Sequence, residues 1–218
     1  MRELGRIVRE RALPVQSHLS ENLSEVEWVK ELAPDAAGYA DAYDRFGLFG
    51  SNGPCVMAHC IYMRDDEIDL MEKRKVFVAH SPQSNVNLQS GIAPMRRFLD
   101  QGVKCGLATD VAGGSSINMF KAVTDAIQVS KLYWRIIDDS YKALTFPEAF
   151  YMATKGGGEF FGRVGSFEEG YEFDLVAIDD SLASTNLKLD IAQRLERTMY
   201  LGHAGFIKAK FVAGRRIL

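Results

Sequence analysis

Cys55-Val56-Met57-Ala58-His59 is an apolar run that ends directly on an imidazole side chain. Three more apolar runs each precede a side chain that can bind a metal: Leu13 to Ser17 before His18, Val76 to Ala79 before His80, and Val103 to Ala108 before Asp110. Continuous apolar runs separated by helix-like stretches are typical of parallel strands that are buried on both faces. The sequence therefore predicts an α/β protein with a parallel sheet.

Two architectures place such strands side by side: a doubly wound open sheet and a (β/α)₈ barrel. In a barrel, the carboxyl ends of successive strands meet at one cavity, where barrel enzymes keep their catalytic residues. An open sheet would spread the same side chains along an edge, so the four polar strand ends favour the barrel. A complete barrel takes about 250 residues, and only four strands are visible. We therefore expect a partial TIM-like barrel.

Helices are expected between these strands, and a second, smaller sheet is expected near the C-terminus. Asn22 followed by Glu25 is typical of a capping box at the start of a helix. Apolar residues at helical spacing predict helices over these ranges: 2–12, 23–33, 65–73, 92–99, 117–137 and 146–153. Strand-like runs at 174–178, 206–213 and 216–218 predict the small sheet.

The composition excludes several classes of protein. The 218 residues carry 26 Lys+Arg against 29 Asp+Glu and are 47% hydrophobic, a balance that is ordinary for a soluble globular protein. A basic run that would indicate nucleic-acid binding is absent, as are an apolar run long enough to span a membrane and a signal peptide. The three cysteines contain no CxxC pair, which argues against a disulfide framework and a cysteine zinc site. These features predict a cytoplasmic protein.

His18, Glu21 and Asp110 suggest metal-assisted hydrolysis. Imidazoles and a carboxylate can hold a catalytic zinc, which lowers the pKa of its water to about 7. A carboxylate that is not a ligand, such as Glu21, can carry protons between this water and a leaving nitrogen. Taken singly, His18 also fits a core histidine, Glu21 a surface residue and Asp110 a helix N-cap. The repeated strand-end pattern, with Gly113 and Gly114 after Asp110, favours a functional site.

Four motifs resemble the amidohydrolase superfamily, and within it the guanine deaminases: His18-Leu-Ser-Glu21, Met57-Ala-His59, Ala79-His-Ser-Pro-Gln-Ser-Asn85 and Gly106-Leu-Ala-Thr-Asp110-Val-Ala-Gly-Gly114. Gly165 to Val176 is similar to the segment that returns the chain to the small β-sandwich of this superfamily. The resemblance implies that residues 1–163 form barrel strands five to eight with their helices. It also implies that residues 164–218 contribute to the sandwich.

The resemblance implies an activity, the hydrolysis of guanine to xanthine and ammonia in purine catabolism, with zinc as cofactor. Iron is an alternative for this type of ligand set. The family's functional residues carry over as follows: metal ligands His18 and Asp110, catalytic residues Glu21, His59 and Asp110, and substrate-binding residues His59, Ser84 and Asn85, the last two in a loop. His80 is expected to support the pocket without binding the metal.

One departure from the family limits these expectations. The family's metal site opens with a His-x-His pair on the first strand, and this sequence contains no such pair. We therefore expect a C-terminal fragment that is inactive alone, arising from a truncated gene, a mis-called start or cloning. Two alternatives stay open: an amidohydrolase acting on a chlorotriazine, a pyrimidine or an S-adenosylhomocysteine-type substrate, and a metal-free assembly module. Because half a barrel exposes two strand edges, we also expect a homodimer or higher oligomer.

Overall fold

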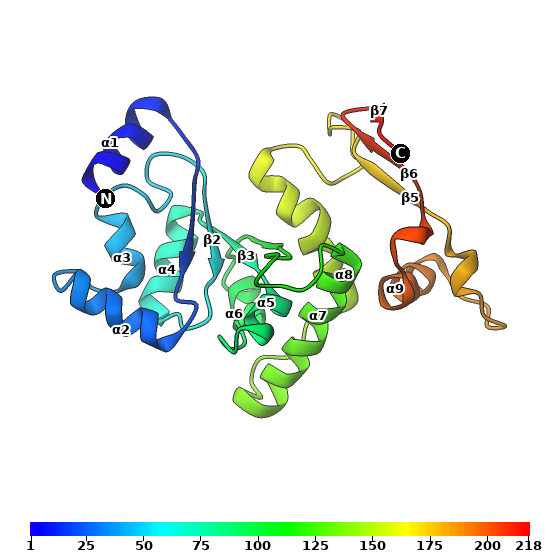
Figure 1. Ribbon diagram of the computed structural model, residues 1–218, viewed down its shortest axis with the longest axis horizontal. Coiled ribbons are helices and arrows are strands. Elements are labelled where there is room, and N and C mark those ends of the chain that lie inside the picture. The colour runs from blue at the N-terminus through cyan, green and yellow to red at the C-terminus, as the bar shows by residue number, and fades with distance from the viewer.

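The computed structural model describes residues 1 to 218 and contains two separate β-sheets (Figure 1). The four-stranded sheet is parallel, with its strands in chain order: β1 (Val15–Leu19), β2 (Cys55–His59), β3 (Phe77–His80) and β4 (Cys105–Leu107). The three-stranded sheet is antiparallel: β5 (Leu175–Ile178), β6 (Ile207–Val212) and β7 (Arg215–Arg216). The predicted α/β class and both predicted sheets are confirmed.

The register of the parallel sheet brings its polar strand ends together. His59 pairs with Leu19, which is the residue after His18. His80 pairs with Leu107. Because consecutive strands run in the same direction without a crossover, their carboxyl ends share one edge of the sheet. Residues that end different strands can therefore contribute to a single site.

Nine α-helices accompany the strands. Their bounds are α1 (Arg2–Arg11), α2 (Leu23–Leu32), α3 (Tyr39–Asp44), α4 (Asp65–Arg74), α5 (Pro82–Asn87), α6 (Met95–Asp100), α7 (Met119–Leu132), α8 (Phe146–Tyr151) and α9 (Ile191–Leu201). The predicted capping box is confirmed, because Asn22 accepts from the backbone of Glu25 and the Glu25 side chain accepts from the backbone of Asn22. The helix predicted over 117–137 is shorter than expected, since α7 begins at Met119 and Tyr133–Ile137 forms a π-helical turn.

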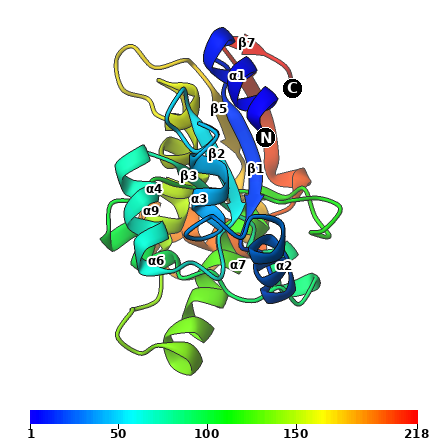
Figure 2. The same cartoon turned by 90° about the vertical axis from the view of Figure 1, so that its left-hand side faces the viewer.

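The main core lies between the parallel sheet and the helices α4 and α6, which lie to one side of the strands in Figure 2. Met57 and Val78 from the strands and Phe98 from α6 are each fully buried in it. The prediction of strands buried on both faces is wrong for β1, where Gln16 and His18 are exposed. These two side chains alternate with the inward-facing Leu19, so they lie on the face of β1 that the helices do not cover.

A smaller apolar cluster joins the C-terminal part to the rest of the chain. Val123 and Ile127 of α7, Ala149 of α8 and Met199 of α9 form its buried centre. Figure 1 shows α7 and α8 between the parallel strands and the β5–β7 sheet. None of the helices is both long and apolar enough to cross a membrane.

Replacing Phe98 by alanine is expected to destabilise the fold by about 3–5 kcal/mol, the usual loss for a buried aromatic side chain. Phe98 is fully buried in the core under the parallel sheet, so its removal leaves a cavity. Urea unfolding measures the change. The same substitution at Phe167, which is 80% exposed, is the matched control, with an expected change within about 0.5 kcal/mol. Equal effects at the two positions would contradict the packing described here.

Candidate metal centre

Two histidines and one aspartate converge at the carboxyl edge of the parallel sheet. His18 lies in β1, His59 is the last residue of β2, and Asp110 follows β4. Each offers a potential ligand atom, and these atoms all lie within 4.8 Å of one another. The rings of His18 and His59 are stacked with their centroids 5.2 Å apart. The structure thus brings together the two predicted metal ligands and adds a third residue, His59, to which the sequence assigned a different role.

Two carboxylates flank the buried ring of His59. Its Nε2 lies 3.7 Å from Oε2 of Glu21 and 3.9 Å from Oδ2 of Asp110. The His59 side chain is 1% exposed, against 18% for Glu21 and 34% for Asp110. Two anionic groups beside a buried imidazole attract a cation, because their mutual repulsion is poorly screened there.

The other nitrogen of His59 is held by Asn85. Nδ1 of His59 and Oδ1 of Asn85 are 2.8 Å apart, and this hydrogen bond fixes the orientation of the ring. Nε2 of His59 then faces the carboxylates of Glu21 and Asp110. This arrangement is what a metal-binding histidine requires, since its second nitrogen is usually held by a hydrogen bond.

The donor set fits zinc. Catalytic zinc sites commonly use three protein ligands drawn from imidazoles and carboxylates, and leave the fourth position for water or substrate. His18, His59 and Asp110 are such a set, and Glu21 lies beside it as a carboxylate outside the group. The same donors accept iron. The group thus contains both ligands that the resemblance implies, with His59 as a further possible donor.

Ser84 and Asn85 lie in helix α5, where the sequence placed a loop. Pro82 occupies the first turn of this six-residue helix. The hydroxyl of Ser84 donates a 2.6 Å hydrogen bond to Oδ2 of Asp110, while Asn85 bonds to His59. Both residues are buried, so they support the site residues from behind. Their assignment to substrate binding stays a prediction.

The segment after β4 brings Asp110 close to Ser84. A Cβ at Gly113 would lie 2.6 Å from Oγ of Ser84 and 2.9 Å from Oδ2 of Asp110, so any larger residue would push this hydrogen bond apart. Helix α7 is capped by Asn118 and not by Asp110, which removes the alternative role of Asp110 as an N-cap. The absence of a side chain at Gly113 therefore lets its backbone lie close to the carboxylate of Asp110 and the hydroxyl of Ser84.

His80 is fully buried at the end of β3, and neither of its ring nitrogens has a hydrogen-bond partner. Burial, followed by the neighbouring ring of His59, lowers the pKa of His80 to about 3. The imidazole is therefore neutral at physiological pH. Its burial agrees with a residue that supports the site from within the protein.

Acidification is expected to destabilise the protein through His80. In the unfolded chain this side chain takes up a proton near pH 6.5, whereas in the folded protein it does so only near pH 3. The unfolded state thus binds more protons between these pH values, and stability falls as the pH is lowered through this window. From pH 7 to pH 5 the loss from this residue should be about 2 kcal/mol.

Urea unfolding at the two pH values, in buffer with a metal chelator, tests this expectation. The wild-type protein and a His80→Gln variant are compared, and the variant should lose about 2 kcal/mol less. An identical pH dependence in both proteins would contradict it.

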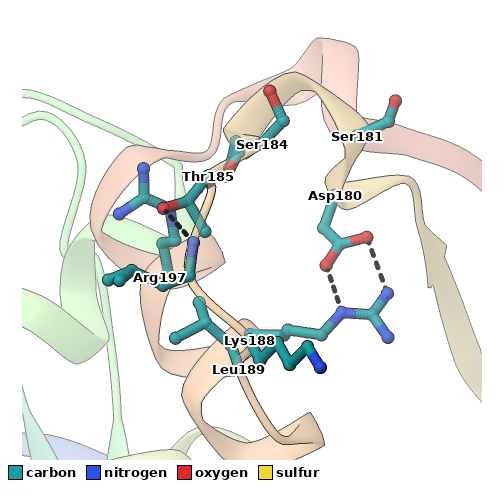
Figure 3. A pocket seen from close by; sticks show the side chains of 10 residues that line it. Asp180, Ser181, Ser184, Thr185, Lys188, Leu189 and Arg197 are labelled. Atoms are coloured by element: carbon teal, nitrogen blue, oxygen red, sulfur yellow. Dashed lines mark hydrogen bonds and ion pairs between the residues drawn. The ribbon is translucent and has the colours of Figure 1, made fainter.

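Another hollow lies away from these strand ends. It measures about 420 Å³ and lies between helix α9 and the segment after β5 (Figure 3). Asp180 accepts two hydrogen bonds of 2.7 and 2.8 Å from Arg194 there, and Arg197 bonds to the carbonyl of Ala183. Its lining contains neither histidine nor cysteine, so the metal-binding chemistry stays with the strand ends.

The chain is similar over its whole length to known proteins. Residues 1–217 match the family described as the Amidohydrolase family. Human guanine deaminase is 37% identical over 229 residues, which cover 100% of this chain and 50% of that protein. The guanine deaminase of C. acetobutylicum, crystallised with guanine in its active site, matches with a TM-score of 0.94 and 46% identity, over 99% of this chain and 51% of that chain.

A zinc-bound adenosine deaminase from Xanthomonas campestris matches less closely. Its TM-score is 0.85 and its identity 25%, over 100% of this chain and 48% of that chain. The chain spans about half the length of the curated relatives it matches.

Proposed function

Because the chain belongs to the amidohydrolase family, we propose that it supplies the metal-binding half of a guanine deaminase, which hydrolyses guanine to xanthine and ammonia. The observation that carries the proposal is the group His18, His59 and Asp110 with Glu21 beside it. The similarity to a protein with guanine in its active site supports the choice of substrate.

The same proposal extends to the fold. We take the four parallel strands as strands five to eight of a barrel, carried by residues 1–163. Residues 164–218 then contribute to the small sandwich. Assembly into a dimer or higher oligomer stays a prediction.

The residues of this chain would divide the reaction among them. His18, His59 and Asp110 would hold the zinc, which supplies water activated for nucleophilic attack at neutral pH. Glu21 takes a proton from the attacking water and delivers it to a ring nitrogen of the purine. Asp110 accepts the other proton from the attacking oxygen, and Glu21 passes this second proton on to the leaving amino group, so that ammonia departs as the carbonyl of xanthine forms.

A chimaera tests the proposal directly. The first half of the C. acetobutylicum guanine deaminase is joined ahead of residue 1, and xanthine formation is measured with zinc present. We expect turnover of guanine by the chimaera and none by the 218-residue chain alone. Turnover of a chlorotriazine or a pyrimidine with no activity on guanine would favour a different substrate. If the 218-residue chain binds no zinc, the metal-free assembly module becomes the better interpretation.

A further inference from the structure

Ser90 reaches the carboxylate of Glu21 from the segment after α5. Its hydroxyl donates a 2.8 Å hydrogen bond to Oε1 of Glu21, although the two residues are 69 positions apart in the chain. Ser90 is 4% exposed, so water competes little for this bond. We propose that Ser90 is a positioning residue that orients Glu21 for proton transfer, an inference that rests on the proposed function.

The backbone of Ser90 is itself held from two sides. Its N–H donates to the carbonyl of Asn85 at 2.8 Å, and its carbonyl accepts from the hydroxyl of Tyr62 at 2.7 Å. Gly91 follows with φ of 136°, and a Cβ there would lie 2.8 Å from the Tyr62 hydroxyl. Only glycine suits this backbone conformation and this close approach. The hydroxyl of Ser90 is therefore presented by a fixed stretch of backbone.

This hydrogen bond gives the two oxygens of Glu21 different tasks. Oε1 accepts from Ser90, whereas Oε2 lies 3.7 Å from Nε2 of His59, on the side of the candidate metal group. The terminal torsion of a glutamate side chain has a broad rotational preference, so an unheld carboxylate would turn readily. Ser90 favours the orientation in which Oε2 faces the metal group. Oε2 then takes the proton from water and passes it to the purine, while the hydroxyl proton stays on Ser90.

Kinetics of the chimaera test this role with three variants. Ser90→Ala should lower kcat by about 10- to 100-fold, as expected for losing a hydrogen bond to a charged group. KM should change by less than about twofold, because no group that contacts the substrate is removed. Ser90→Thr restores the hydroxyl and should restore kcat. Ser81→Ala is the matched control, since Ser81 is 1% exposed in the same part of the chain and its hydroxyl has no partner.

Two kinetic results would overturn the inference. One is a kcat for Ser90→Ala equal to that of Ser81→Ala. The other is a threonine variant as slow as the alanine variant, which would assign Ser90 a packing role. If Ser90→Ala does not fold, Tyr62→Phe serves in its place, because it removes the hydrogen bond that holds the Ser90 carbonyl. This variant should lower kcat by about threefold, which corresponds to roughly half the free energy of a typical hydrogen bond. An unchanged kcat in Tyr62→Phe then counts against the inference.

A structural comparison separates this inference from the proposed function. Crystal structures of the 218-residue chain and its Ser90→Ala variant should differ in the orientation of the Glu21 carboxylate. If the chimaera releases no xanthine, the proposed function fails, yet the two crystal structures still decide the role of Ser90. An unchanged Glu21 orientation in the variant would overturn it.

Discussion

Glu21→Gln is expected to slow guanine hydrolysis by the chimaera by about 10²- to 10⁴-fold, the usual contribution of a general acid–base group. A glutamine keeps the size of the side chain and can still accept from Ser90 through its amide oxygen. The glutamine side chain cannot take up a proton at neutral pH, so no group transfers the proton from water to the purine nitrogen. Steady-state rates of xanthine formation measure the loss.

The affinity for zinc should change little in this variant, because Glu21 lies outside the group His18, His59 and Asp110. Zinc titration of the 218-residue chain checks this without any turnover. Glu27→Gln is the matched control, since Glu27 is exposed on the neighbouring helix α2 and pairs only with Lys30. A Glu21→Gln variant that keeps most of its activity would remove Glu21 from the mechanism. A variant that loses zinc would make Glu21 a ligand instead.

Local patterns were sufficient to predict the four parallel strands and the approach of His18 and Asp110 to one another. Apolar runs followed by a polar residue identified the ends of β1 and β2 to within two residues, and the glycines after Asp110 favoured a functional site. The parallel order of the strands then placed His18 and Asp110 at one edge. The strand ends and their shared edge depend on neighbouring residues and on simple rules of topology, so they can be predicted from the sequence.

Side-chain contacts across the site depend on geometry that the sequence does not display. The strand pattern predicts that His59 shares an edge with His18 and Asp110, but not the positive φ of 71° at His59 or the stacking of its ring on His18. The bond from Ser90 to Glu21 spans 69 residues. Helix α5 is too short for a periodic pattern, which is why Ser84 and Asn85 were assigned to a loop.

Helix α9 is a different case, because its signal is present in the sequence. Ile191, Leu195 and Met199 recur every four residues, and Asp190 with Gln193 forms a capping box before them. This spacing is typical of a helix, which the ranges predicted above do not include, and Met199 is buried against α7. Met199 and the partly buried Leu195 attach the C-terminal part to the remainder of the chain, whereas Ile191 is exposed.

Asp110→Asn is expected to weaken zinc binding by more than about 100-fold, beyond the usual cost of losing a residue that only supports a metal ligand. The carboxylate is the only negative charge in the group His18, His59 and Asp110. An amide of the same shape removes that charge and offers a weaker donor. It can still accept from Ser84 through its oxygen, so the hydrogen bond at 2.6 Å need not be lost and the fold should be kept. The loss is therefore assigned to the metal and not to packing.

Zinc titration of the 218-residue chain, followed by metal analysis after dialysis, measures this loss independently of catalysis. Asp125→Asn on α7 is the matched control, because Asp125 pairs with Lys121 and does not belong to the group His18, His59 and Asp110. His18→Ala should weaken binding by a similar factor, since both residues would then hold the same ion. If the Asp110 and His18 variants bind zinc as tightly as the wild-type chain, the ion occupies another place, and the convergence of the strand ends has a structural origin alone.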